Sequence, residues 1–352
     1  MMYGKKIHKK FNKSRYSSFI LAGDVGGTNI NAGIFGIRKR LPELLESFKF
    51  KSKEIKGLDV AVNETLEIIV KEYSIILTKA CFAVAGVVSP QNDFANVTNA
   101  PWDVDRKVLL KKTKLKHVII INDFEAIGYG INMLGMKDIV TIKKAKKIPK
   151  AQIVVIGAGT GLGKTTSSYD ESRKSYIPLH CEAGHTDFPA QNEEELKLVD
   201  FIRKRKKIKG SISYEQVVSG QGLENTYLFL RKTNRNAATK YTNEIDKSKN
   251  RAELISEYRK IDSTCKEVFR IFAEAYAKFA RNFALDSIAL GGVYIAGGIA
   301  PKNKEIFDKS FIKLFEDNYM LSGVLKRMPI YLIVNTDVGL LGAGFVAARE
   351  MG

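Results

Sequence analysis

Three glycine-rich turns, each beside a short apolar run, restrict what this chain can fold into more than any other feature. The first turn, residues 24–29 (DVGGTN), separates two runs with strand-like alternation; the second, 157–165 (GAGTGLGKT), follows an apolar run; the third, 295–301 (IAGGIAP), ends one. Paired glycines let backbone N–H groups approach an anion, because no Cβ stands in the way. Each turn is therefore a candidate ligand contact, with an ordinary hairpin or strand-to-helix turn as the alternative.

Apolar runs typical of buried strands recur along the chain, at residues 81–88, 118–121, 153–156, 293–296 and 330–334. Between residues 266 and 286, aromatic side chains fall on one helical face, namely Phe272, Tyr276, Phe279 and Phe283. We expect this stripe to belong to the core rather than to a cofactor site. The alternation of strands and helices predicts the α/β class.

The strongly basic composition does not by itself identify a partner. The 352 residues include 57 Lys and Arg against 38 Asp and Glu, a net charge of +19, but the basic runs are dispersed over residues 5–10, 143–150 and 203–209. Dispersed charge is typical of a solvated surface, so no specific nucleic-acid partner is expected. Residues 1–16 are Lys-rich with few apolar side chains, which predicts a basic flexible tail.

Cysteine usage and hydropathy indicate a cytoplasmic protein. The three cysteines, Cys81, Cys181 and Cys265, are far apart and form no C-x-x-C pair, which argues against a disulfide framework or a structural zinc site. No apolar run approaches the length of a membrane span, and the run at 19–22 is too short for a signal-peptide core.

The second glycine turn resembles a P-loop, the phosphate-binding motif G-x-x-x-x-G-K-[ST], except that Ala158 stands where the first glycine belongs. A P-loop NTPase is therefore a rival hypothesis. A P-loop must open directly into a helix, whereas residues 165–170 are rich in β-forming and turn residues. The context favours a β-hairpin, with Lys164 on its second strand.

Polar side chains follow one of the predicted strands and lead the first turn. Asn122 and Asp123 come directly after the run at 118–121, and the carboxyl ends of strands in open α/β sheets face the ligand crevice. Asp123 is thus a candidate general base and Asn122 a candidate hydroxyl binder, with Asp123 as a helix N-cap as the alternative. Asp24 offers a carboxylate for hydrated Mg²⁺, and Thr28 adds a hydroxyl.

A second polar cluster, Glu182 and His185, offers a carboxylate and an imidazole three residues apart. Such a pair suits the adjacent hydroxyls of a sugar, and a surface turn is the alternative. Asn99 and Glu215 are further polar residues beside apolar runs, but chemistry alone does not select them.

Taken in order, these segments resemble the bacterial-type glucokinase family of the actin/hexokinase superfamily. The resemblance runs from about residue 18 to the C-terminus and rests on segments 24–29 (DVGGTN), 98–102 (TNAPW), 121–124 (INDF), 159–163 (GTGLG), 182–188 (EAGHTDF), 214–220 (YEQVVSG), 292–299 (GVYIAGGI) and 339–342 (GLLG). Lys164 departs from the family, which has a small or apolar residue there.

The resemblance implies a two-lobed actin/hexokinase-like (ribonuclease H-like) fold, each lobe a mixed sheet flanked by helices. The small N-terminal lobe would comprise residues 17–133 plus 338–352, and the large C-terminal lobe residues 134–337. A helix starting near residue 338 would pack on the N-terminal lobe. A homodimer is usual for similar proteins.

It also implies a reaction, the transfer of the γ-phosphate of Mg-ATP to the 6-hydroxyl of glucose, with Asp123 as the base. The nucleotide contacts would be Gly23, Asp24, Val25, Gly26, Gly27, Thr28, Gly159, Thr160, Gly161, Gly297 and Gly298, with Asp24 directed toward Mg²⁺ through water. The sugar contacts would be Asn99, Asn122, Asp123, Glu182, His185 and Glu215.

Two alternatives stay open beside the P-loop hypothesis. One is another hexose kinase of the superfamily; the related repressor/kinase group usually carries a cysteine-rich zinc motif, whereas this chain has only Cys181 in that region. The other is a sugar-sensing regulator without turnover, against which the presence of Asp123 and the lack of a helix-turn-helix pattern argue.

Overall fold

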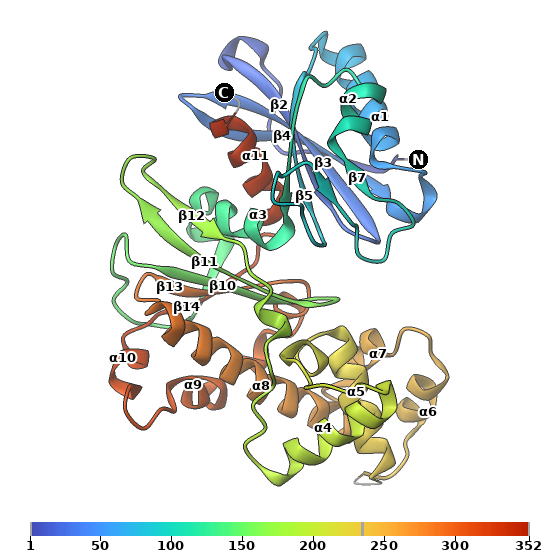
Figure 1. The fold of residues 1–352 in the computed structure, drawn as a ribbon, viewed down its shortest axis with the longest axis vertical. Helices are drawn as coiled ribbons and strands as arrows, with labels where there is room; N and C mark the ends of the chain where they lie inside the picture. The colour runs from blue at the N-terminus through green and yellow to red at the C-terminus, as the bar shows by residue number, and fades with distance from the viewer. Residues whose placement is uncertain (1, 234–235, 351–352) are drawn as a thin grey trace. The chain divides into compact units, whose positions relative to one another are not determined.

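The structure is a computed structural model that describes residues 2–233 and 236–350. The chain forms two compact units, shown as a ribbon in Figure 1. The first unit comprises Met1–Lys137, Asp170–His180 and Asn335–Gly352, and the second comprises Asp138–Tyr169 and Cys181–Val334. The α/β prediction is confirmed, since each unit has a sheet that mixes parallel and antiparallel strands, together with helices.

The first unit is organised around a six-stranded sheet in the order β1-β4-β3-β2-β5-β8. Its strands are β1 (Met2–Ile7), β2 (Ser18–Val25), β3 (Asn29–Arg38), β4 (Leu41–Lys51), β5 (Lys79–Val84) and β8 (His117–Asn122). Neighbours from β1 to β2 are antiparallel, whereas β2, β5 and β8 are parallel. The remaining elements are α1 (Leu58–Tyr73), β6 (Phe94–Ala95), β7 (Val104–Asp105), α2 (Arg106–Lys112), α3 (Asp123–Gly130), β12 (Ser175–Leu179) and α11 (Val338–Glu350).

Alternation along the strands gives this sheet two buried faces. In β2, Leu21 packs into one core cluster with Phe48 and Phe82, whereas its neighbour Ile20 packs into another with Leu340 of α11. Successive side chains of a strand point to opposite faces, so the apolar run of β2 is covered on both sides. The predicted C-terminal helix begins at Val338 and contacts β2, β5 and α3, as the resemblance implied.

The predicted flexible tail over residues 1–16 is wrong for its first part. Residues Met2–Ile7 form β1, which pairs with β4. Lys5 ion-pairs with Glu46, whose side chain is 1% exposed, at 3.3 Å, and with Glu72 at 2.5 Å. Lys5 and Lys6, which suggested a solvated tail, thus belong to an edge strand, and Lys5 neutralises a buried carboxylate from the neighbouring strand.

The second unit has strands in the order β11-β10-β13-β14-β9. These are β9 (Ile139–Lys143), β10 (Ile153–Ala158), β11 (Leu162–Asp170), β13 (Gly292–Ala296) and β14 (Ile330–Ile333). The helices of this unit are α4 (Glu193–Lys206), α5 (Gly220–Lys232), α6 (Lys240–Lys247), α7 (Arg251–Tyr258), α8 (Ser263–Ser287), α9 (Lys309–Glu316) and α10 (Ser322–Lys326).

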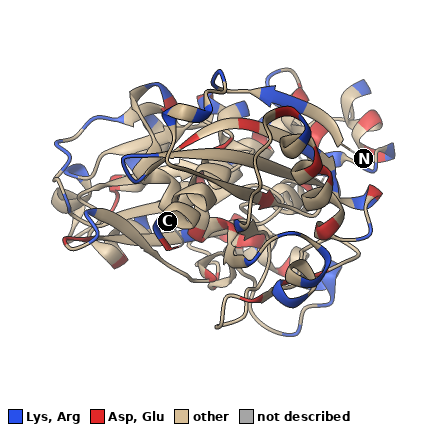
Figure 2. Ribbon diagram, turned by 90° about the horizontal axis from the view of Figure 1, so that it is seen from above, with Lys and Arg blue, Asp and Glu red and all other residues tan. Residues whose placement is uncertain are grey.

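The aromatic stripe predicted as core lies on α8, the 25-residue helix of the second unit. Phe272, Tyr276 and Phe279 are at most 1% exposed, and Phe283 packs against the same cluster. None of the helices in the described ranges combines the length and hydrophobicity needed to cross a membrane. Figure 2 shows Lys and Arg scattered among Asp and Glu over many elements.

Candidate functional site

The parallel strands of the first unit bring the predicted polar residues to one edge of its sheet. Asp24, near the end of β2, pairs in register with Ala83 of β5, and the next residue of β5, Val84, pairs with Asn122 at the end of β8. Asp24, Asn122 and the adjacent Asp123 therefore lie at the carboxyl edge of the same three strands, where open α/β sheets bind ligands.

The first glycine turn is fixed by contacts within the same unit. The N–H of Gly26 donates to the carbonyl of Asn29 at 2.9 Å, and the hydroxyl of Ser52 donates to the carbonyl of Gly26 at 2.6 Å. A Cβ at Gly27 would lie 2.0 Å from the carbonyl oxygen of Thr98. The turn is thus packed against the segment that carries Asn99, an exposed residue in the left-handed region with φ of 64°.

The carboxyl group of Asp24 is buried and lies near a second carboxylate, that of Asp337. Burial raises the pKa of its carboxyl group to about 6, and the nearby carboxylate of Asp337 adds to the rise. Asp337 accepts a hydrogen bond from the side chain of Asn31 at 3.2 Å and lies 3.6 Å from the ammonium of Lys6. Sequence reasoning missed Asp337, although it follows the apolar run at 330–334 as Asp123 follows its own strand.

The donor set around Asp24 fits Mg²⁺. Magnesium prefers hard oxygen ligands, and it usually binds one or two carboxylates and keeps its remaining positions for water and phosphate oxygens. A dication near Asp24 would offset the repulsion between the two carboxylates, which itself raises the pKa of Asp24. Within residues 2–233 and 236–350, no three His, Cys, Asp or Glu side chains gather into a protein-only metal site.

Asn122, and not Asp123, is the N-cap of α3, so the capping alternative for Asp123 is wrong. The side-chain oxygen of Asn122 accepts hydrogen bonds from the N–H groups of Phe124 at 2.8 Å and Glu125 at 3.2 Å. Its amide nitrogen donates to the carbonyl of Gly86 at 3.1 Å. An amide nitrogen carries two protons, so Asn122 keeps one N–H beyond these contacts. Asp123 is the first residue of α3 and accepts from the N–H of Phe124 at 3.0 Å.

The second glycine turn closes the β10–β11 hairpin in the second unit. Ala158 and Leu162 are the last paired residues, and the N–H of Gly159 donates to the carbonyl of Gly161 at 2.8 Å. The third glycine turn reaches the same hairpin, because the N–H of Ile299 donates to the carbonyl of Ala158 at 3.2 Å. Two of the predicted nucleotide loops, 159–161 and 297–298, are thus neighbours within one unit.

The predicted sugar contacts of the second unit lie beside this hairpin. One carboxylate oxygen of Glu215 accepts a hydrogen bond from the N–H of Leu162 at 2.9 Å. Glu182 and His185 are exposed around a short 3₁₀ helix, Ala183–His185. Gly184 in that helix packs on the carbonyl of Leu162, where a Cβ would lie only 1.9 Å from the oxygen. Both segments therefore contact the backbone of the same residue, Leu162.

Lys164 does not belong to a P-loop. The residues after the second turn form strand β11 through Asp170, with Lys164 opposite Ile156 of β10. Its ammonium lies 3.6 Å from the carboxylate of Asp286 and 5.0 Å from the centroid of the Phe283 ring. Lys164 thus connects β11 to α8. The pairing of β11 with β10 confirms the hairpin prediction.

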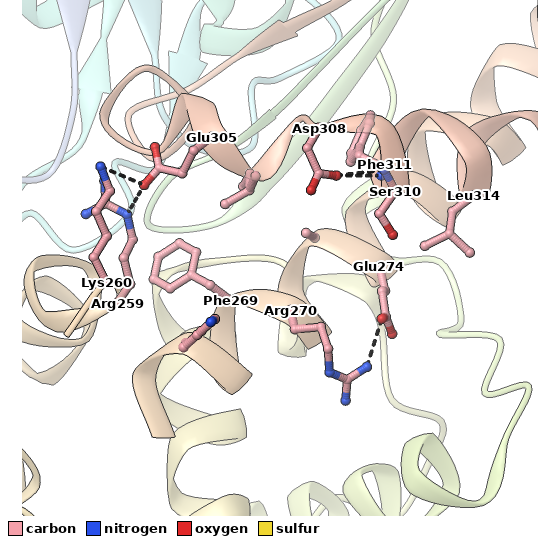
Figure 3. Close-up of a pocket in the computed structure, with 13 residues that line it drawn as sticks. Arg259, Lys260, Phe269, Arg270, Glu274, Glu305, Asp308, Ser310, Phe311 and Leu314 are labelled. Carbon is pink, nitrogen blue, oxygen red and sulfur yellow. Dashed lines mark hydrogen bonds and ion pairs between the residues drawn. The ribbon is translucent and has the colours of Figure 1, made fainter. Parts of the chain in front are cut away.

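A cavity of about 450 Å³ elsewhere in the second unit does not have the character of a polar substrate site (Figure 3). Its walls include Phe269 of α8 together with Phe311 and Leu314 of α9. Its charged rim is largely neutralised internally, since Glu305 pairs with Arg259 at 2.6 Å and with Lys260 at 3.6 Å. The predicted residues lie outside it.

Comparison with known proteins identifies related sequences and folds. A family model described as Glucokinase matches residues 21–350. A glucokinase from Nostoc sp. is 33% identical over 350 residues, covering 94% of this chain and 99% of its own, and a glucokinase from Yersinia enterocolitica is 32% identical over 343 residues, covering 96% and 98%.

Solved structures share the fold. A glucokinase from Balamuthia mandrillaris in complex with glucose has a TM-score of 0.78 at 20% identity, covering 94% of this chain and 93% of its own. A glucokinase from an Antarctic psychrotroph has a TM-score of 0.76 at 24% identity, covering 94% and 98%. A ROK family glucokinase from Streptomyces griseus with glucose and AMPPNP has a TM-score of 0.66 at 18% identity, covering 94% and 100%.

Proposed function

Since the chain belongs to the glucokinase family, as the family model and its relatives show, we propose that it transfers the γ-phosphate of ATP to the 6-hydroxyl of glucose. The observation that carries the proposal is that Asp123, Asp24 and the first glycine turn lie at the same edge of the sheet, the carboxyl edge of β2, β5 and β8. A base and a phosphate-binding turn on one sheet edge are the parts that phosphoryl transfer to an alcohol needs.

Asp123 acts as the general base in this proposal. Its carboxylate takes the proton of the 6-hydroxyl as the oxygen attacks the γ-phosphorus, and the bond from that phosphorus to the β,γ-bridging oxygen breaks, with ADP as the leaving group. Asn122 caps α3. The carboxylate of Asp123 is therefore not needed as a helix cap. Asn122 would use its remaining N–H for a sugar hydroxyl.

Two glycine loops contact the phosphates in this proposal. They comprise Gly23, Val25, Gly26, Gly27 and Thr28 for the first loop and Gly159, Thr160 and Gly161 for the second, while Gly297 and Gly298 flank the adenosine. Mg²⁺, held by Asp24 through water, would neutralise charge on the transferring phosphoryl group. The protein's own contribution is to position the reactants, because phosphoryl transfer requires little covalent chemistry from side chains.

Sugar recognition in this proposal uses Asn99, Asn122, Glu182, His185 and Glu215. Carboxylate, amide and imidazole groups together offer the donors and acceptors that a ring of hydroxyls needs. We further propose that the two units are the small and large lobes of the fold, that the protein is a cytoplasmic homodimer, and that glucose is preferred over other hexoses.

A coupled ADP-release assay over a panel of glucose, mannose, fructose and N-acetylglucosamine tests this proposal, with and without Mg²⁺. We expect glucose-dependent ADP release that requires the cation, and loss of turnover by several powers of ten in Asp123→Ala with sugar binding retained. Absence of sugar-dependent turnover, or full activity in Asp123→Ala, would overturn it. Sedimentation velocity tests the dimer separately.

A further inference from the structure

Glu215 directly joins a proposed sugar contact to a proposed phosphate loop. Its Oε2 atom accepts a hydrogen bond from the N–H of Leu162 at 2.9 Å, and Leu162 is the first residue of β11, directly after the glycine turn. A Cβ at Gly161 would lie 2.6 Å from the same oxygen. The carboxylate therefore lies against the backbone of the loop itself.

The segment that carries Glu215 also holds the other side of this loop. The N–H of Gly220 donates to the carbonyl of Gly159 at 2.8 Å. The hydroxyl of Ser219 donates to the main-chain carbonyl of Glu215 at 2.7 Å, which connects the two contact points. The loop is thus bound at Gly159 and at Leu162 by one short segment, and the second of these bonds is to a charged acceptor, the stronger kind.

We infer that Glu215 couples sugar binding to nucleotide binding by holding the second phosphate loop with one carboxylate oxygen and a sugar hydroxyl with the other. This inference rests on the proposed function for the sugar contact. A carboxylate has two oxygens and several lone pairs, so one side chain is able to make both contacts. A sugar that orders the carboxylate also orders the N–H groups of the loop, and each ligand then strengthens the binding of the other.

The first measurement asks whether Glu215 acts on the nucleotide site when no sugar is present. Calorimetric titration with Mg-AMPPNP alone compares the wild type with Glu215→Ala. We expect this variant to bind AMPPNP at least about fivefold more weakly. A residue that only binds sugar would leave this affinity unchanged, and that result would overturn the inference.

The second measurement gives the coupling itself, the ratio of glucose affinities with and without saturating AMPPNP. We expect a ratio of about five or more in the wild type, a ratio near one in Glu215→Ala, and an intermediate ratio in Glu215→Gln, whose amide oxygen still accepts from Leu162. Asn99→Gly is the matched control, because it removes a proposed sugar contact from a left-handed position that glycine tolerates. It should weaken glucose binding equally in both conditions.

The outcomes separate this inference from the proposed function. If the wild type binds glucose and AMPPNP independently, or Glu215→Ala keeps the wild-type ratio, the inference is wrong and the kinase proposal stands. If the wild type does not bind glucose at all, the proposed function fails and the inference fails with it. Melting temperatures of Glu215→Ala, Glu215→Gln and Asn99→Gly establish that each variant is folded under the titration conditions.

Discussion

Asn122 caps helix α3 and Asp123 is the first residue of that helix, so two adjacent polar residues have separate jobs. The side-chain oxygen of Asn122 accepts from the N–H groups of Phe124 and Glu125. Capping by Asn122 fixes the start of α3, and the fixed helix start in turn positions Asp123.

The division of roles between these residues predicts that the two alanine variants lose unequal amounts of stability. Asn122→Ala removes the cap of α3 and leaves the part-buried N–H groups of Phe124 and Glu125 without that acceptor, so we expect a loss of about 1–2 kcal/mol in the free energy of unfolding. Asp123→Ala keeps the cap and should cost less than half as much, although it abolishes turnover. Urea denaturation of both variants beside the wild type provides the measurement. An Asp123→Ala variant less stable than Asn122→Ala would contradict this assignment.

The raised pKa of Asp24 predicts that the nucleotide-free protein loses folding stability as the pH rises. Burial and the nearby Asp337 raise the pKa of this carboxyl from 3.8 to about 6. A carboxyl whose pKa is raised on folding stabilises the folded state fully below pH 4, and this contribution is lost as the pH rises through 6. At pH 7.5 the ionised Asp24 therefore destabilises the fold relative to a neutral side chain of the same shape.

Asp24→Asn should accordingly be more stable than the wild type at pH 7.5 in magnesium-free buffer, by up to about 3 kcal/mol. The two proteins should converge near pH 4. Asp337→Asn removes only the second cause, so its gain should be smaller. Urea titrations at the two pH values provide the measurement, and an Asp24→Asn protein that is less stable at pH 7.5 would refute the argument. Mg-ADP should raise the melting temperature of the wild type more than that of Asp24→Asn.

The position of Lys164 predicts that its replacement changes turnover only slightly, whereas replacement of a P-loop lysine would reduce turnover greatly. Its ammonium pairs with Asp286, whose side chain is 62% exposed, and such partly solvated pairs contribute about 0–1 kcal/mol. Lys164→Met keeps the length and the apolar contact with Phe283. We expect turnover within about threefold of wild type, and stability within about 1 kcal/mol. Loss of AMPPNP binding in this variant would restore the P-loop hypothesis.

The sequence predicted those parts of the molecule that local pattern determines. Apolar runs located β2, β8 and β10, and the β-forming residues after Gly163 correctly excluded a helix at Lys164. Chemistry alone did not select Glu215, because its bond to Leu162 crosses 53 residues of sequence. Its proposed sugar role, like those of the other site residues, stays a prediction that rests on the resemblance.

The N-terminal segment shows why other parts of the fold could not be predicted from local sequence. Its lysines are typical of solvated tails, and nothing near residue 5 indicates that the partner is Glu46 in β4. Strand β1 pairs with residues more than 35 positions away, so its local composition carried the wrong signal. Likewise Asp337 lies beside Asp24 only because α11 returns to β2.

The pairing of Lys5 with Glu46 makes the N-terminal strand part of the stability of the first unit. Glu46 is almost completely buried, and one of its oxygens is already engaged by the hydroxyl of Tyr73. Lys5→Met would leave a buried carboxylate without its cation, which we expect to cost about 1–3 kcal/mol. Lys10→Ala, at an exposed position in the same basic run, should cost less than about 0.5 kcal/mol. Equal denaturation midpoints for the two variants would mean that β1 contributes nothing through this ion pair, whereas recovery of the Lys5→Met loss in the double variant Lys5→Met/Glu46→Gln would assign the cost to the unpaired carboxylate.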